Sequence, residues 1–179
     1  MADVISAEAS AARKAAPPGP TLGDRPAFDV IELFFFAYRD FVRDADEALA
    51  DYGFGRAHHR VLHFVDRNPG LTVTELLDIL KITKQSLGRV LRELVEKSFI
   101  ESREGASDRR QRLLYVTERG DRLARELARL QTRRVSRALR GLDAQEAEAV
   151  RRFFFEIIDP EERAKVANLT GASTPGARD

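Results

Sequence analysis

Apolar side chains recur every three or four residues over most of the chain between residues 27 and 159, a spacing that predicts amphipathic helices. We expect helices at 27–53, 55–70, 71–80, 82–98, 118–141 and 142–159. Two shorter segments, 99–103 and 112–117, alternate apolar and polar residues in the manner of strands. The expected order along the chain is therefore four helices, two strands and two helices.

Two of these helices begin with a recognisable capping box. Thr72 and Glu75 have its spacing, in which the threonine hydroxyl accepts from a backbone N–H and the glutamate reaches back to the cap residue. Asp143 and Glu146 repeat this spacing before the last expected helix. Pro160 is expected to end that helix, because proline does not continue a helical hydrogen-bond pattern.

The segment 82–98 has two chemically different faces. Leu87, Val90, Leu91 and Leu94 share one face and are expected to be buried. The N-terminal cap, the first turn and the opposite face carry the polar residues Thr83, Lys84, Gln85, Ser86, Arg89 and Arg92. Gly88 lies at the margin and weakens the helix by about 1 kcal/mol relative to alanine. It permits close approach either of DNA or of a neighbouring helix.

Two short helices joined by a tight turn, followed by a two-stranded hairpin, form a winged helix-turn-helix. The second helix of such a pair can enter the DNA major groove, which is about 12 Å wide. Its polar side chains are types that bind base edges or phosphates. We therefore predict a mainly α fold of six helices with a small β-wing of two or three strands.

Positive charge gathers in the middle of the chain. Residues 81–140 hold 17 Lys and Arg against 8 Asp and Glu, whereas the remainder holds 13 against 21. Part of this charge lies at the hairpin tip, EGASDRRQR (104–112), which could reach the minor groove beside a major-groove helix. This distribution favours a face that binds a polyanion, although solvated helix arginines also produce it.

The composition argues against several other functions. The chain has no cysteine, so it can form no disulfide and has no thiol nucleophile. No apolar run approaches the ~20 residues of a membrane span, and we expect a cytoplasmic, nucleoid-associated protein without membrane contact. Carboxylates are scattered and no nucleotide-binding or nucleophile motif occurs, so we expect no enzyme.

The three histidines, His58, His59 and His63, lie close together in one expected helix. His59 and His63 have the i, i+4 spacing that can hold a metal or contact a haem. Two histidines alone do not make a site, so we expect no metal and no cofactor. Two alternatives stay open, namely a metal- or haem-responsive regulator and a winged-helix protein-interaction module without DNA binding.

Two phenylalanine triplets indicate a second copy of the chain. Three consecutive residues on a helix span about 200°, more than the stripe that one core covers. Some of these rings are therefore expected to face a two-fold partner, whose symmetry would suit palindromic DNA; a monomer with a thicker core is the alternative. The expected interface residues are Phe34, Phe35, Phe36, Phe153, Phe154 and Phe155.

The wing sequence DRRQRLLYVTERG (108–120) resembles that of the MarR family of bacterial transcription regulators. The family pattern is Asp-x-Arg followed by a strand ending in Leu-Thr. Asp108 and Arg110 stand at the matching positions, and Val116 replaces the leucine before Thr117.

The resemblance extends over roughly residues 28–160. The stretches NPGLTVTELLDIL (68–80) and SLGRVLRELVEKSFI (86–100) are similar to the family's helix-turn-helix and the strand that follows. The family often has glycine where this chain has Ser98, so the exit from the helix could differ. Within the family, ITKQSLGRVLRELV (82–95) looks most like the PetP-type regulators of α-proteobacteria.

The resemblance implies an intertwined homodimer, with interlocking first, fifth and sixth helices, whose two winged lobes read a pseudo-palindromic operator in double-stranded DNA. It implies that Asp108 fastens the wing through an ion pair and that Arg110 enters the minor groove, while Arg109 and Arg112 add charge. Repression is the commoner mode in the family. A small aromatic or phenolic effector is also implied, in a pocket lined by residues drawn from Tyr38, Arg39, His59 and His63.

Five segments follow from these expectations. Residues 26–54 and 118–165 form the dimerisation helices, and 55–117 form the DNA-binding lobe. Residues 1–25 and 166–179 are poor in large apolar side chains, so we expect a disordered leader and tail.

Overall fold

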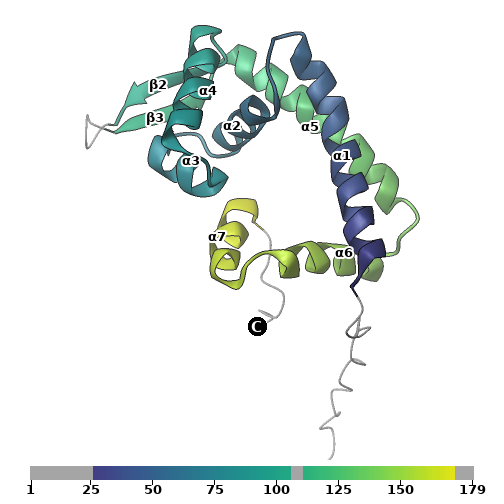
Figure 1. Ribbon diagram of the computed structural model, residues 1–179. Coiled ribbons are helices and arrows are strands. Elements are labelled where there is room, and N and C mark those ends of the chain that lie inside the picture. The colour runs from purple at the N-terminus through teal and green to yellow at the C-terminus, as the bar shows by residue number, and fades with distance from the viewer. Residues whose placement is uncertain (1–25, 106–110, 172–179) are drawn as a thin grey trace, which may run out of the picture. The chain divides into compact units, whose positions relative to one another are not determined.

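The computed structural model of the protein describes residues 26–105 and 111–171, and these form seven helices and three strands (Figure 1). The helices are α1 (Phe28–Ala50), α2 (Arg56–Arg67), α3 (Val73–Leu80), α4 (Lys84–Glu96), α5 (Glu118–Leu139), α6 (Ala144–Ile157) and α7 (Pro160–Thr170). The strands are β1 (Leu71–Thr72), β2 (Ile100–Glu104) and β3 (Arg112–Val116). The chain divides into two compact units, Met1–Tyr38 and Arg39–Asp179.

The predicted fold class, mainly α with a small β-wing in a winged helix-turn-helix, is confirmed, and the sheet has three antiparallel strands. Its order is β1-β3-β2, with Leu71 opposite Leu114 and Ile100 opposite Val116. Strand β1 is the two-residue segment immediately before α3, so the sheet and the helix-turn-helix are joined at Thr72. Pairing of β1 with β3 therefore joins the wing to the start of α3.

The expectation of six helices was wrong, because the described residues contain a seventh. Pro160 does not simply end α6; it occupies the first turn of α7. Proline suits this position, where its missing N–H is not needed and its fixed φ is already helical. The tail expected from residue 166 is therefore helical to Thr170. The leader 1–25 and residues 172–179 lie outside the described residues.

Both predicted capping boxes are present. The Thr72 hydroxyl accepts from the Glu75 N–H at 3.2 Å, and the Glu75 carboxylate accepts from the Thr72 N–H at 2.8 Å. Asp143 and Glu146 form the same reciprocal pair at the start of α6, with both distances 2.8 Å. Each box satisfies two backbone N–H groups that a helix start leaves without partners.

The hydrophobic core lies in the second unit. Helix α2 packs against α3, α4, α5 and β3. The most deeply buried side chains come from the second unit's part of α1, from α2 to α5, from the turn before β2 and from β2 itself. They include Leu49, Leu62, Leu76, Leu87, Leu94, Phe99, Ile100 and Leu127. By contrast, the described part of the first unit has no buried residue between 26 and 38.

Candidate DNA-binding surface

Helix α4 has the two faces that its sequence predicts. Leu87, Val90 and Leu94 are buried in the core and Leu91 is half-buried against it, which fixes the rotation of the helix about its axis. The six polar residues proposed for DNA contact, Thr83, Lys84, Gln85, Ser86, Arg89 and Arg92, are all exposed. Among the described residues, no ion pair neutralises Lys84, Arg89 or Arg92. The exposed face of α4 is thus a compact group of hydrogen-bond donors with unbalanced positive charge.

The start of α4 is set by a short turn and a cap. Lys81 adopts a left-handed conformation, with φ of 48°, and ends α3. The Thr83 hydroxyl then accepts from the Ser86 N–H at 3.2 Å and donates to the Ser86 hydroxyl at 2.9 Å. These bonds place the Thr83 and Ser86 side chains together at the N-terminal end of the helix, where the backbone N–H groups favour an anion such as phosphate.

The other end of α4 is held by residues from the start of α5. The Arg119 guanidinium donates to the Lys97 carbonyl at 3.0 Å and lies 4.4 Å from the centre of the Phe99 ring. The Thr117 hydroxyl donates to the Ser98 carbonyl at 2.7 Å and also accepts from the Gly120 N–H as the cap of α5. The exit of α4 and the entry of α5 are therefore bonded to each other.

Ser98, which stands where the family often has glycine, adopts a left-handed backbone conformation. Its φ is +59°, in the left-handed region that costs a serine more than a glycine. Phe99, immediately after it, is fully buried. The centre of its ring lies 5.4 Å from that of Tyr52 and 5.1 Å from that of Phe54.

Gly88 faces open space, which narrows the two explanations left by its sequence. A Cβ atom built at this position meets no described atom within 4 Å. Close packing of a neighbouring helix of the same chain is therefore not the reason for a glycine here. An external surface approaching the exposed face of α4 remains as an explanation.

The stem of the wing is described, but its tip is not. The Gly105 N–H donates to the Gln111 carbonyl at 3.1 Å and closes the stem. Arg112 is exposed and lies 3.7 Å from Glu104, and the Arg103 guanidinium stacks 4.4 Å from the centre of the Tyr115 ring. The proposed wing residues Asp108, Arg109 and Arg110 lie outside the described residues.

The histidines occupy two different environments. The Nδ1 atom of His58 accepts from the Gly55 N–H at 3.2 Å, so its Nε2 carries the hydrogen and donates to Glu93 at 2.9 Å. His59 and His63 lie side by side with ring centres 6.5 Å apart. Burial lowers the pKa of both, and the neighbouring His63 further lowers the pKa of His59. Within 26–105 and 111–171, no group of three or more potential ligands could hold a metal.

The four candidate effector residues are only partly brought together. His59 and His63 are adjacent, whereas Arg39 pairs with Asp40 at 3.0 Å on the exposed side of α1. Tyr38 is exposed and belongs to the first unit. The structure thus shows His59 and His63 in contact and gives Arg39 an ion pair with Asp40.

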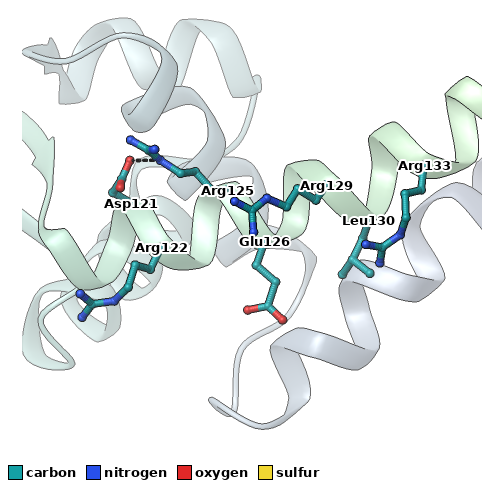
Figure 2. Close-up of a pocket in the computed structure, with 7 residues that line it drawn as sticks. All are labelled: Asp121, Arg122, Arg125, Glu126, Arg129, Leu130 and Arg133. Carbon is teal, nitrogen blue, oxygen red and sulfur yellow. Dashed lines mark hydrogen bonds and ion pairs between the residues drawn. The ribbon is translucent and has the colours of Figure 1, made fainter.

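Two surface hollows lie along α5. The larger, of about 570 Å³, is lined by Asp121, Arg122, Arg125, Glu126, Arg129, Leu130 and Arg133 (Figure 2). Figure 2 shows these side chains projecting from one helix, so the hollow has a single wall. Such a surface is basic, but it does not enclose a ligand.

The phenylalanine triplets differ in exposure. Phe34, Phe35 and Phe36 are 47–62% exposed in the first unit, and Phe153 and Phe154 are 46% and 53% exposed on α6. Phe155 was expected at the dimer interface, but it is 7% exposed and lies beneath the Arg163 guanidinium. It is buried within its own chain, unlike the five other rings of the two triplets.

The fold and the family profile lead to the same class of protein. The profile of the MarR family matches residues 52–111. The chain is 44% identical over 160 residues to the HTH-type transcriptional regulator PetP of Rhodobacter capsulatus, covering 88% of this chain and 96% of that protein. The chain therefore belongs to the MarR family and is a helix-turn-helix transcriptional regulator.

Solved structures show the same fold at lower sequence identity. The crystal structure of MarR has a TM-score of 0.60 at 23% identity, covering 83% of this chain and 98% of MarR. That of the transcriptional regulator SlyA has a TM-score of 0.62 at 21% identity, covering 78% and 95%. Across the described residues, no helix has the length and apolar character required to cross a membrane.

Proposed function

We propose that the protein regulates transcription by binding a specific double-stranded DNA operator through the exposed face of α4. The observation that carries the proposal is the exposed set Lys84, Gln85, Arg89 and Arg92 on a helix whose opposite face is buried. Arginine can bind guanine through two hydrogen bonds and glutamine can bind adenine in the same way. The three cations lack ion-pair partners among the described residues, so no such pair has to break before they meet phosphate or base.

A protein-interaction module is the weaker reading of the same fold. Such a module would tolerate apolar or acidic side chains on α4, whereas this helix presents arginine, lysine and glutamine. The family membership points in the same direction. DNA binding is therefore the function that this surface supports best.

The wing is proposed to add contacts beside those of α4. Its stem is fixed to the helix pair through β1, and Arg112 at the start of β3 is exposed. Arg110 would enter the minor groove, with Asp108 fastening the wing, and Arg109 would meet the backbone phosphates. The narrow minor groove of A·T tracts attracts such arginines.

The functional unit is proposed to be a homodimer. Large apolar side chains at Phe28, Ile31, Leu33 and Phe35 are 60–69% exposed in the first unit, which is costly for an isolated chain in water. Phe153, Phe154 and Ile157 are similarly exposed on α6. A two-fold copy would cover both sets, and it would place two α4 helices on the half-sites of a pseudo-palindromic operator.

Repression is the proposed mode, relieved by a small aromatic or phenolic effector. His59 and His63 are the candidates for its pocket that lie together, and their lowered pKa values favour uncharged rings that suit an aromatic ligand. An effector would reduce DNA affinity by the coupling free energy, which is typically about 1–3 kcal/mol.

The test is fluorescence anisotropy of the purified protein with DNA from upstream of its own gene and with scrambled DNA, over a salt series. We expect a preference of about 10³-fold or more for the upstream DNA, and an affinity that falls steeply with salt. Equal, salt-sensitive affinity for both DNAs would reject the upstream region as operator. No binding to either DNA at low salt would reject the proposed function and favour the protein-interaction reading.

A further inference from the structure

Four charged side chains join α7 to the end of α3. The ammonium of Lys81 lies 2.8 Å from Asp78 and 2.9 Å from Glu162. The ammonium of Lys165 donates to the Asp78 carboxylate and, at 2.9 Å, to the Asp78 backbone carbonyl. It also lies 3.6 Å from Glu162. We call these four residues the α3–α7 cluster; two belong to α3 and its C-terminal cap and two to α7.

The charges of the α3–α7 cluster balance and reinforce one another. Hydrogen bonds from Lys165 and Lys81 lower the pKa of Asp78 to about 2, and hydrogen bonds to Asp78 and Glu162 raise the pKa of Lys81 to about 12. A single exposed ion pair contributes little, because solvent screens it and its side chains lose entropy. Here each cation contacts both anions, and the backbone carbonyl anchors Lys165 to the last turn of α3.

The other end of this connection lies at the junction of α6 and α7. The Arg163 guanidinium donates to the Ile158 carbonyl at 2.9 Å and to the Glu156 carbonyl at 2.7 Å. It also pairs with the Glu156 carboxylate at 2.8 Å and covers Phe155, the buried ring of α6. Arg163 thus restricts the angle between α6 and α7, two residues before Lys165.

Through α7, these contacts connect α6 to the helix-turn-helix. Asp78 and Lys81 flank the end of α3, and Lys81 is followed after one residue by Thr83, the cap of α4. We propose that Lys165 and Glu162 are positioning residues for DNA recognition, which hold the α3–α4 turn relative to α6 and so set the orientation of α4. This inference rests on the proposed function of α4.

The DNA arm of the test compares Lys165→Ala with Arg151→Ala. Both substitutions remove one positive charge, but Arg151 pairs with Glu148 inside α6 and lies outside the α3–α7 cluster. We expect Lys165→Ala to reduce the preference for operator over scrambled DNA by about 3-fold to 10-fold. We expect Arg151→Ala to leave it unchanged and Lys165→Arg to restore most of it. Equal preference in Lys165→Ala and the wild type would overturn the inference.

The structural arm needs no DNA. Because the chain has no cysteine, Thr74→Cys on α3 and Asn168→Cys on α7 can carry a pair of spin labels at exposed positions without background labelling. We expect a narrow distribution of label distances in the otherwise wild-type protein, broadened by Lys165→Ala and by high salt but not by Arg151→Ala. An unchanged distribution in Lys165→Ala would refute the link. If the wild type binds no DNA, the proposed function fails, whereas the distance distributions still report on the α3–α7 cluster.

Discussion

Replacing Gly120 with alanine tests how α5 is joined to the winged lobe. Gly120 lies in the first turn of α5, and a Cβ atom there would be 2.0 Å from the Phe99 carbonyl oxygen and 3.0 Å from its carbon. Carbon and oxygen atoms in favourable contact are about 3.3 Å apart or more. Since the obstacle is the backbone of Phe99, immediately before β2, no side-chain rotation relieves the clash, and α5 must move by roughly 1 Å.

The expected cost follows from what that movement disrupts. Overpacking costs about 1–3 kcal/mol. The movement also strains the bond from the Thr117 N–H to the Phe99 carbonyl, 3.0 Å long, and the Thr117 cap on the Gly120 N–H; loss of such a cap costs about 1 kcal/mol. Against this, alanine is better in a helix by up to about 1 kcal/mol. The free energy of unfolding should therefore fall by about 1–3 kcal/mol.

Urea unfolding followed by far-ultraviolet circular dichroism measures this change at a fixed protein concentration. Gly88→Ala is the matched control, because it is also a helical glycine but its Cβ would meet nothing within 4 Å. The two substitutions should change stability in opposite directions, with Gly88→Ala more stable by about 0.5–1 kcal/mol. A Gly120→Ala protein as stable as the wild type would refute the close contact between α5 and Phe99.

Three further predictions concern the same lobe. If Gly88 permits close approach of DNA, Gly88→Ala should weaken operator binding at least 3-fold although it stabilises the fold. Fluorescence anisotropy measures this affinity, and unchanged binding would reject that role for Gly88. Arg119→Met should lower the free energy of unfolding by about 1 kcal/mol through loss of its backbone hydrogen bond and its contact with Phe99, and an unchanged urea midpoint would contradict this. Burial holds the pKa values of His59 and His63 below the ordinary 6.5. As the pH drops, the unfolded chain therefore binds protons before the folded chain does, and the free energy of unfolding should fall from about pH 7.5 through 6.5. The double variant His59→Gln, His63→Gln should flatten that slope in thermal melts, and an equally steep slope would show that other groups cause it.

The helix-turn-helix could be predicted because its signals are local. The capping box of Thr72 and Glu75 marks the start of α3, and the spacing of Leu87, Val90 and Leu94 marks the buried face of α4. Both patterns involve residues within one or two helical turns, where sequence spacing and spatial proximity coincide. The exposure of Arg89 and Arg92 follows directly from the same spacing.

Helix α7 could not be predicted in this way. It has no buried residue among its eleven, so it leaves no apolar periodicity in the sequence. It contacts α3 through Glu162 and Lys165, whose partners are more than eighty residues away. Pro160 was interpreted as a terminator, although proline is equally suited to begin a helix.

The contacts that hold the C-terminal end of α4 also could not be predicted from sequence patterns. The Arg119 contact with the Lys97 carbonyl joins residues 22 positions apart, and nothing in the basic composition of α5 distinguishes Arg119 from its neighbours. The burial of Phe155 was missed for a related reason. The angular width of a Phe triplet shows that some ring faces outward, but it does not show which one its own chain covers.

The most direct test of the account is the operator preference of the double variant Arg89→Ala, Arg92→Ala against a charge-matched control. Arg122→Ala, Arg151→Ala also removes two positive charges, from arginines paired within their own helices α5 and α6. If α4 reads DNA, the Arg89→Ala, Arg92→Ala variant should lose at least 10-fold of its preference for operator over scrambled DNA. The control should keep the wild-type preference, and both variants should bind DNA more weakly at high salt. If both variants retain the wild-type preference, the exposed face of α4 is not the surface that recognises the operator.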